Sequence, residues 1–230
     1  MVTIAIDAMG GDFGPRVTVP SVLSSLEKFP DLNIILFGHR AKLDVCLHKI
    51  TASSRLEIIH TDQQVSAGEK ISAALRKKES SMRLALDAVR DDRAQAMVSA
   101  GNTGALVAIS HYVLKMLLGI DRPALVARLP NIRGFSYMLD LGANVESNSE
   151  NLYQFALMGS AFARVMGLQG SPKVALLNIG SEEIKGNEDI RLANAILKES
   201  DLIDYVGYIE GDDIYKGVVD VIVTNGYSGN

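Results

Sequence analysis

Tryptophan is absent from this sequence of 230 residues, aromatic residues make up only 6% of it, and Cys46 is its single cysteine. Few aromatics argue against a stacking platform for single-stranded nucleic acid. One cysteine excludes an internal disulfide and any metal site built from cysteines. It also fits a reducing compartment.

The sequence also lacks an excess of positive charge and a long apolar run. Its formal net charge is -4, which argues against a general nucleic-acid surface. No apolar window is as long as a membrane-spanning helix needs. The start, Met1–Asp7, shows no basic region and no apolar core of a signal peptide. We therefore expect a globular cytoplasmic protein without nucleic-acid partners.

Short β-branched runs alternate with stretches of helical period, which predicts βαβ crossovers and a mostly parallel sheet covered on both faces. Two of the strands are too close together for a helix between them, so we expect a hairpin there. The expected strands are Val2–Asp7, Leu32–Gly38, Arg55–His60, Ala94–Ser99, Ala124–Arg128, Phe135–Leu141, Lys173–Asn178, Tyr205–Glu210 and Val218–Thr224. The expected helices run from Pro15 to near Pro30 and over Ala41–Ile50, from Ser80 or Ser81 through Val89, and over Thr103–Leu118, Glu150–Met166 and Glu188–Ser200.

The alternation continues along most of the chain, so we expect a single α/β domain over residues 1–230. A boundary, if there is one, falls between Asn131 and Asn148, where the alternation breaks. The last turn, Asn225–Asn230, would normally open a helix, and the chain is expected to stop before that helix begins. A parallel strand without its crossover has an exposed edge. The sequence therefore favours a chain truncated at its C-terminus.

Five turns that contain glycine together with Asn or Asp follow predicted strands. They are Asp7–Pro15, Ser99–Gly104, Asp140–Asn144, Asn178–Gly186 and Asn225–Asn230. In an open parallel sheet, ligands bind at the carboxyl ends of the strands. Glycine lets backbone N–H groups approach an anion, and the start of the next helix favours the same charge. Any one of these turns is more often only a turn, but five at one edge favour a site for phosphate or a phosphorylated ligand.

Other motifs are weak or absent. The sequence contains no P-loop, no complete dinucleotide fingerprint and no nucleophile elbow. His39, His48, His60 and His111 show no metal-ligand spacing. Lys185 lies in a glycine-rich turn before a helix, where an ammonium suggests a nearby anion, although a solvated lysine is the commoner case. The densest basic cluster is either a solvated face or a docking patch for an acidic macromolecule; it comprises Arg76, Lys77, Lys78 and Arg83.

Taken together and in order, these motifs resemble the bacterial phosphate acyltransferase (PlsX) family. The matching segments are Asp7–Pro15, Ser80–Met82, Val98–Leu106, Arg122–Ala124, Leu139–Asn144, Ala175–Gly180 and Glu183–Gly186. The resemblance spans essentially the whole chain. Two positions depart from it: Asn225 stands where the family usually has Asp, and Ile71 replaces a proline. Family chains also continue beyond residue 230.

The resemblance implies an enzyme of phospholipid synthesis. Inorganic phosphate attacks the thioester of a long-chain acyl-acyl carrier protein, giving acyl phosphate and free carrier protein. The implied fold is a three-layer α/β/α sandwich, similar to phosphotransacetylases and isocitrate-type dehydrogenases, with no metal or organic cofactor. The implied partners are acyl carrier protein, phosphate, a second copy of the chain in a homodimer, and a membrane-bound glycerol-3-phosphate acyltransferase. The implied location is the cytoplasm, including the inner face of the membrane.

On this reading, Lys185 stabilises the developing oxyanion, and Asn178 and Asn225 act beside it. The expected substrate-binding residues are Asp7, Gly10, Gly11, Asp12, Ser99, Gly101, Asn102, Thr103, Asp140, Gly142 and Asn144. Among them Gly10, Gly11, Gly101, Asn102 and Thr103 form the anion cradle. The basic cluster docks the acidic carrier protein. Two alternatives stay open: an acyl-CoA phosphotransacetylase, and a non-catalytic scaffold for phospholipid-synthesis enzymes.

Overall fold

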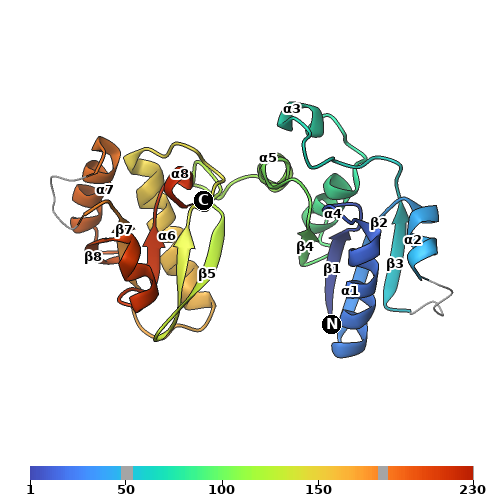
Figure 1. Ribbon diagram of the computed structural model, residues 1–230, viewed down its shortest axis with the longest axis horizontal. Helices are drawn as coiled ribbons and strands as arrows, with labels where there is room; N and C mark the ends of the chain where they lie inside the picture. The colour runs from blue at the N-terminus through green and yellow to red at the C-terminus, as the bar shows by residue number, and fades with distance from the viewer. Residues whose placement is uncertain (48–53, 181–185, 230) are drawn as a thin grey trace. The chain divides into compact units, whose positions relative to one another are not determined.

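The computed structural model describes residues 1–47, 54–180 and 186–229 (Figure 1). It divides the chain into two compact units, Met1–Lys115 and Met116–Asn230. The strands within residues 2–99 form one sheet and those within residues 126–223 form another, so each unit has its own sheet. The division lies ahead of Asn131–Asn148, the segment in which the sequence pattern allows a boundary if there is one. That the whole chain forms one catalytic domain stays a prediction.

The first unit contains a parallel sheet in the order β3-β2-β1-β4. Its strands are β1 (Val2–Asp7), β2 (Leu32–Gly38), β3 (Leu56–His60) and β4 (Ala96–Ser99). Its helices are α1 (Pro15–Lys28), α2 (Arg40–Leu47), α3 (Ile71–Ala74), α4 (Ser81–Arg90) and α5 (Thr103–Leu114). The helix expected over Ala41–Ile50 is described as far as Leu47. Its last residues lie outside the described part of the chain.

Helices cover both faces of this sheet. Successive strand residues point to opposite faces, so Leu36 packs with Val19 of α1 in one core, and Phe37 packs with Ala85 of α4 in another. α5 lies on α4, where Ile109 joins a third buried cluster. The first unit is therefore an α/β/α sandwich. Its four parallel strands bring four carboxyl ends to one edge.

The second unit contains a sheet in the order β5-β6-β9-β7-β8. Its strands are β5 (Val126–Asn131), β6 (Gly134–Leu139), β7 (Lys173–Leu177), β8 (Asp204–Ile209) and β9 (Val221–Val223). Its helices are α6 (Ser149–Val165), α7 (Glu188–Lys198), the 3-10 helix η1 (Gly211–Lys216) and α8 (Gly226–Gly229). β5 and β6 form the expected antiparallel hairpin, and the other pairs are parallel.

α6 and α7 share one face of the second sheet. Phe155 of α6 and Leu197 of α7 pack in one cluster with Leu176 of β7. On the opposite face Ile214 of η1 packs against the cluster that contains Ile222 of β9. The mostly parallel α/β class expected from the sequence is confirmed.

The end of the chain corrects one expectation. The sequence pattern predicts that the chain stops before a helix begins, but residues 226–229 already form the helical turn α8. The Asn225 side chain makes this turn favourable, because its Oδ1 accepts the Ser228 N–H at 2.8 Å. Within the described residues, no helix has both the length and the apolar character that crossing a bilayer would require.

Candidate functional site

Asp7 and Ser99 end the neighbouring strands β1 and β4 and are register partners in the sheet. The Asp7 carboxylate is only 2% exposed. Its Oδ1 accepts the Ser81 hydroxyl at 2.6 Å and the Met9 N–H at 3.1 Å, and its Oδ2 accepts the Ser99 hydroxyl at 2.7 Å. Protein donors therefore occupy both carboxylate oxygens, and this fits Asp7 as an organiser of the strand ends.

Two of the predicted cradle glycines meet at this point. The Ser99 Oγ accepts the Gly101 N–H at 3.1 Å. A Cβ on Gly10 would lie 2.8 Å from the Asp7 Oδ2, 2.8 Å from the Gly101 nitrogen and 2.9 Å from the Ser99 Oγ. Only glycine fits there, because each of these neighbours is held in place. The loops after β1 and β4 are thus brought together, as the sequence analysis expected for this pair.

The other predicted cradle residues border the same loops. A Cβ on Gly11, whose φ is +84°, would lie 3.1 Å from the Ala100 carbonyl oxygen of the loop after β4. Gly11, Asp12 and Thr103 are exposed. Thr103 begins α5, whose first-turn N–H groups and positive dipole end face outward from the helix. This part of the first unit is suited to an anion.

Asn102 has a different position from the one expected of a substrate ligand. It is the N-cap of α5, and its Oδ1 accepts the Ala105 N–H at 2.9 Å. Its Nδ2 donates to the Ala67 and Glu69 carbonyl oxygens at 2.8 and 3.1 Å. The whole carboxamide is used within the protein, so Asn102 holds the start of α5.

In the second unit, Asp140 directly follows β6 and is fully buried. Its Oδ1 accepts the Leu125 and Ala143 N–H groups at 2.8 and 3.1 Å. Its Oδ2 accepts the backbone N–H and the side-chain amide of Asn144, at 2.7 and 3.0 Å. Asp140, predicted to bind substrate, therefore shapes the turn that presents Asn144.

The turn after β6 packs against the turn after β9. The Asn144 carbonyl oxygen accepts the Gly226 N–H at 2.9 Å. A Cβ on Gly226 would lie 2.9 Å from the Cα of Gly142, so both glycines allow this close approach. Two more of the five predicted turns are thereby brought together, and Asn225 lies beside Asn144 at this junction.

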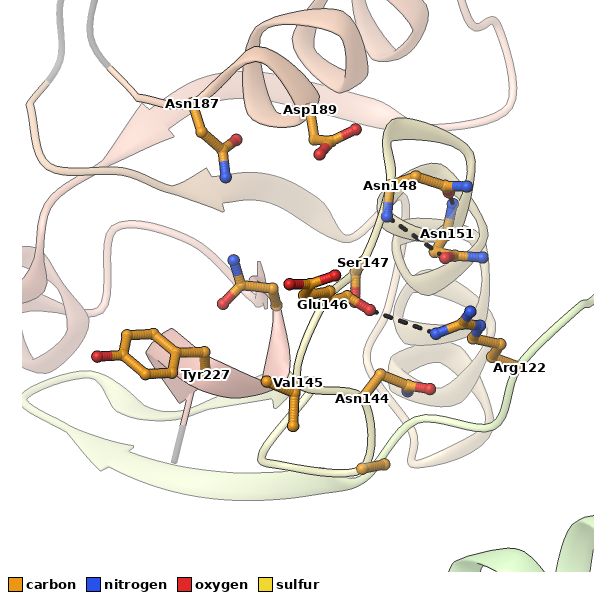
Figure 2. Close-up of a pocket in the computed structure, with 12 residues that line it drawn as sticks. Arg122, Asn144, Val145, Glu146, Ser147, Asn148, Asn151, Asn187, Asp189 and Tyr227 are labelled. Carbon is orange, nitrogen blue, oxygen red and sulfur yellow. Dashed lines mark hydrogen bonds between the residues drawn. The ribbon is translucent and has the colours of Figure 1, made fainter.

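A cavity of about 1040 Å³ opens beside these turns (Figure 2). It is lined by Arg122, Ala143, Asn144, Val145, Glu146, Ser147, Asn148, Asn151, Asn187, Asp189, Asn225 and Tyr227. Two helices begin at its wall: Asn148 caps α6 and Asn187 caps α7. Helix starts favour anions, and Arg122 adds a positive charge, whereas Glu146 and Asp189 oppose it. The cavity is therefore polar, and its positive group, Arg122, comes from a different part of the chain than its negative groups, Glu146 and Asp189.

A second cavity of 460 Å³ adjoins the first, since Asn187 and Asn225 line both. Its other lining residues include Asn178, Leu177 and Ile190. The Asn178 side chain, 7% exposed, donates to the Gly180 carbonyl oxygen at 3.0 Å. Three asparagines from the turns after β6, β7 and β9 therefore border two neighbouring cavities of the second unit.

The five predicted turns thus form two sets, two turns in the first unit and three in the second. A single site made by all five stays a prediction. Lys185, the predicted oxyanion stabiliser, lies outside the described residues. Over residues 1–47, 54–180 and 186–229, no group of three or more His, Cys, Asp or Glu side chains is placed to hold a metal ion.

The predicted docking cluster contains two kinds of cation. The Lys77 ammonium donates to the Glu69 carboxylate at 2.7 Å and to the Gln64 carbonyl oxygen at 2.8 Å. The Arg83 guanidinium pairs with Asp87 at 3.1 Å and is mostly buried. Arg76 and Lys78 are exposed, and neither forms an ion pair with another described residue.

The pKa of the Glu69 carboxyl is lowered from its ordinary value. The largest cause is the hydrogen bond from Lys77, and the next is the hydrogen bond from the Ser66 N–H.

Some residues at these sites carried no functional assignment from the sequence. Ser81 touches Asp7, and Asn187 borders both cavities. Ser147 is buried at the wall of the larger cavity, and its Oγ has no hydrogen-bond partner among the described residues. Asn187 precedes a helical pattern that begins with Glu188, so its capping position could have been inferred. The contact of Ser81 joins residues 74 positions apart, which no local pattern reveals.

Known proteins match the chain along its length. Residues 2–230 match the family described as "Fatty acid synthesis protein". The phosphate acyltransferase of Shewanella baltica (strain OS155) is 54% identical over 232 residues, covering 99% of this chain and 68% of that protein. The phosphate acyltransferase of Nitrosococcus oceani is 55% identical, covering 100% of this chain and 68% of that protein.

Solved structures support the fold. The EutD phosphotransacetylase from Staphylococcus aureus superposes with a TM-score of 0.68 at 18% identity, covering 100% of this chain and 79% of that one. A branched-chain phosphotransacylase from Enterococcus faecalis V583 gives 0.63 at 16% identity, with 100% and 82% covered. At this identity the likeness concerns the fold alone. The family match and the sequence identities together show that the chain belongs to the fatty acid synthesis protein family, among its phosphate acyltransferases.

Proposed function

We propose that the chain transfers a long-chain acyl group from acyl carrier protein to inorganic phosphate. A phosphate oxygen attacks the thioester carbonyl carbon, a C–O bond forms, and the C–S bond breaks. The products are acyl phosphate and the carrier's thiol, which takes up the proton released. Phosphate is itself the nucleophile, so catalysis requires positioning and charge stabilisation and no covalent enzyme intermediate.

The observation that carries this proposal is the junction of Asp7, Gly10, Ser99 and Gly101 next to the start of α5. Hydrogen bonds of 2.6 to 3.1 Å join three chain segments there: the end of β1, the end of β4 with its following loop, and the start of α4. Exposed backbone at Gly11 and Thr103 adjoins it. Preorganised N–H groups at a helix start are suited to a phosphate, and we assign phosphate binding to this cradle.

The second unit is assigned to the acyl donor. Asn144, Asn178 and Asn225 supply carboxamides without net charge at the two cavities. We assign the orientation of the thioester and donation to its oxygen to Asn225, which lines both cavities. The Asn144 NH₂ already donates to Asp140 and to the Pro123 carbonyl oxygen, so Asn144 shapes the wall of the site. Lys185 is proposed as the main stabiliser of that oxygen. Removing one such donor typically lowers kcat by about 100-fold to 1,000-fold, so a Lys185→Ala variant with full turnover would eliminate this role.

The carrier protein is proposed to dock on the basic cluster of the first unit. Arg76 and Lys78 are its exposed cations, whereas Lys77 and Arg83 are held by Glu69 and Asp87. We assign the electrostatic attraction of an acidic carrier mainly to the exposed pair. We further propose a cytoplasmic homodimer that acts at the inner face of the membrane, beside a membrane-bound glycerol-3-phosphate acyltransferase.

The reaction is tested by incubating the chain with long-chain acyl carrier protein and phosphate. Acyl phosphate is trapped with hydroxylamine as the hydroxamate, and the carrier's free thiol is titrated. We expect equal amounts of both products, and neither when phosphate is omitted. Thiol release that does not depend on phosphate would contradict the proposal, as would no product at all, which would favour the scaffold.

The donor is tested by replacing acyl carrier protein with acyl-CoA of the same chain length. We expect a higher kcat/KM for the carrier-bound donor, because the exposed Arg76 and Lys78 are assigned to an acidic protein surface. Equal or higher kcat/KM with acyl-CoA would favour the phosphotransacetylase alternative.

A further inference from the structure

Ser81 lies at the phosphate cradle although it belongs to a distant helix. It is the first residue of α4 and is 1% exposed. Its hydroxyl donates to the Asp7 Oδ1 at 2.6 Å, across 74 residues of sequence. We propose that Ser81 is a positioning residue that sets the affinity of the cradle for phosphate. This inference rests on the proposed function.

Ser81 is the first link in a chain of hydrogen bonds that ends at cradle backbone. A hydroxyl has one proton, and both Ser81 and Ser99 give theirs to Asp7. The Ser99 oxygen is thereby turned to accept the Gly101 N–H at 3.1 Å. Hydrogen bonds to an ionised group are short and strong. The orientation of the Gly101 peptide therefore depends on Ser81 through Asp7 and Ser99.

Asp7 needs these donors because no cation among the described residues pairs with it. It is 2% exposed and forms no ion pair with any other residue that the structure describes. A buried carboxylate is tolerated only when hydrogen bonds replace its hydration. Its donors are the hydroxyls of Ser81 and Ser99 and the Met9 N–H. Without Ser81, Oδ1 would keep only the longest of these three bonds, and the carboxylate would be free to turn.

A turn of the carboxylate would disturb the glycine loops directly. The Asp7 Oδ2 lies against Gly10, so closely that a Cβ there would be 2.8 Å away. The Gly101 nitrogen and the Ser99 Oγ lie at similar distances from that Cβ position. Packing this tight transmits a small rotation to the backbone. We expect weaker phosphate binding and unchanged donor binding, because the thioester is assigned to the second unit and the docking residues Arg76 and Lys78 lie outside this chain of hydrogen bonds.

The neighbouring serine provides a matched control. Ser80 is the N-cap of α4, with its Oγ accepting the Arg83 N–H at 3.3 Å and donating to the Lys77 carbonyl oxygen at 3.0 Å. It is as buried as Ser81 but has no hydrogen bond to Asp7. Ser80→Ala removes a cap and lowers stability, without changing the cradle. Ser81→Ala makes the same chemical change as Ser80→Ala, the loss of one serine hydroxyl, at the neighbouring position of the same helix start.

The experiment compares Ser81→Ala, Ser80→Ala and the unchanged chain in the acyl phosphate assay. For Ser81→Ala we expect the KM for phosphate to rise about tenfold, the value of one charge-assisted hydrogen bond. The kcat and the KM for acyl carrier protein should stay within about twofold. Ser80→Ala should leave the kcat and the KM for phosphate unchanged. Equal increases in both variants, or an unchanged KM for phosphate in Ser81→Ala, would overturn the inference.

Two further measurements separate this inference from the proposed function. Inorganic phosphate should raise the thermal midpoint of the unchanged chain and of Ser80→Ala, and the increase should be smaller for Ser81→Ala. Ser81→Thr keeps a hydroxyl and should recover most of the phosphate affinity, while Ser99→Ala should lose it. If the unchanged chain forms no acyl phosphate but binds phosphate in this Ser81-dependent way, the proposed function fails and the role of Ser81 stands.

Discussion

The Asp140 carboxylate binds Asn144 twice, accepting its backbone N–H at 2.7 Å and its side-chain amide at 3.0 Å. The same amide donates to the Pro123 carbonyl oxygen at 2.7 Å. The Asn144 carbonyl oxygen accepts the Gly226 N–H at 2.9 Å. One buried acid thus holds an asparagine at the wall of the larger cavity and, through it, the turn after β9.

Replacing Asp140 by Asn should destabilise the second unit. The new NH₂ group would face N–H donors, leaving at least one of them unpaired in a fully buried place. We expect the free energy of unfolding to fall by about 2–4 kcal/mol, measured by urea denaturation. Asp201→Asn, at an exposed position, should change it by less than about 0.5 kcal/mol. Equal midpoints for the two variants would contradict the organising role of Asp140.

Replacing Gly10 by Ala should damage the phosphate cradle. The added methyl group would lie 2.8 Å from the Asp7 Oδ2 and the Gly101 nitrogen, neither of which can move away freely. We expect a loss of about 1–3 kcal/mol in stability from overpacking and a KM for phosphate raised by about tenfold or more. Gly68→Ala is the control, because a Cβ at Gly68 meets nothing within 4 Å. If both variants keep the original KM, Gly10 does not shape the site.

Acidification should remove the benefit of the Glu69–Lys77 pair. The Lys77 hydrogen bond lowers the pKa of Glu69, so the pair stabilises the fold above the ordinary Glu value of about 4.3. This stabilisation is lost as the pH falls through the lower folded-state pKa. Lys77→Met should cost at most about 1 kcal/mol near neutral pH, and the cost should shrink below about pH 4.

Urea denaturation at several pH values measures this difference. Lys78→Met is the matched control, since Lys78 forms no ion pair with another described residue. Its effect should not depend on pH over this range. If the stability lost in Lys77→Met does not change with pH, the loss comes from the hydrogen bond between Lys77 and the Gln64 carbonyl oxygen alone.

Charge reversal at Arg76 and Lys78 should weaken docking of the carrier protein. We expect the Arg76→Glu, Lys78→Glu double variant to raise the KM for acyl carrier protein about threefold to tenfold. Its KM should also depend less on salt, because screening has less attraction to remove. The control double variant Lys28→Glu, Lys42→Glu makes the same change in net charge on α1 and α2. Equal effects of both double variants would assign the attraction to net charge and reject a local patch.

Much of the secondary structure followed from local sequence patterns. The helix start at Pro15, the cap at Ser80 and the hairpin of β5 and β6 agree with expectation. The short elements α3, η1 and α8 were not anticipated, because each has at most six residues and too few turns to show a hydrophobic period. The last strand, expected over Val218–Thr224, is only Val221–Val223.

The candidate site was predictable in its residue types and less so in the use of each side chain. Glycines at strand ends predicted that neighbouring loops approach each other closely, and the structure shows such contacts at Gly10 and at Gly226. Asp7, Asn102 and Asp140 were expected to contact substrate, yet their polar atoms are largely occupied by protein partners. Sequence spacing does not reveal such saturation, because the partners come from other elements.

The sequence by itself determined where chain segments turn, cap and alternate, since propensity, capping and glycine conformation act over a few residues. Only the tertiary structure decided that a serine of α4 reaches the end of β1, and that the polar turns divide between two sheets. Hydrogen bonds between residues far apart in the chain depend on how helices pack on strands, and that packing is a property of the whole buried core.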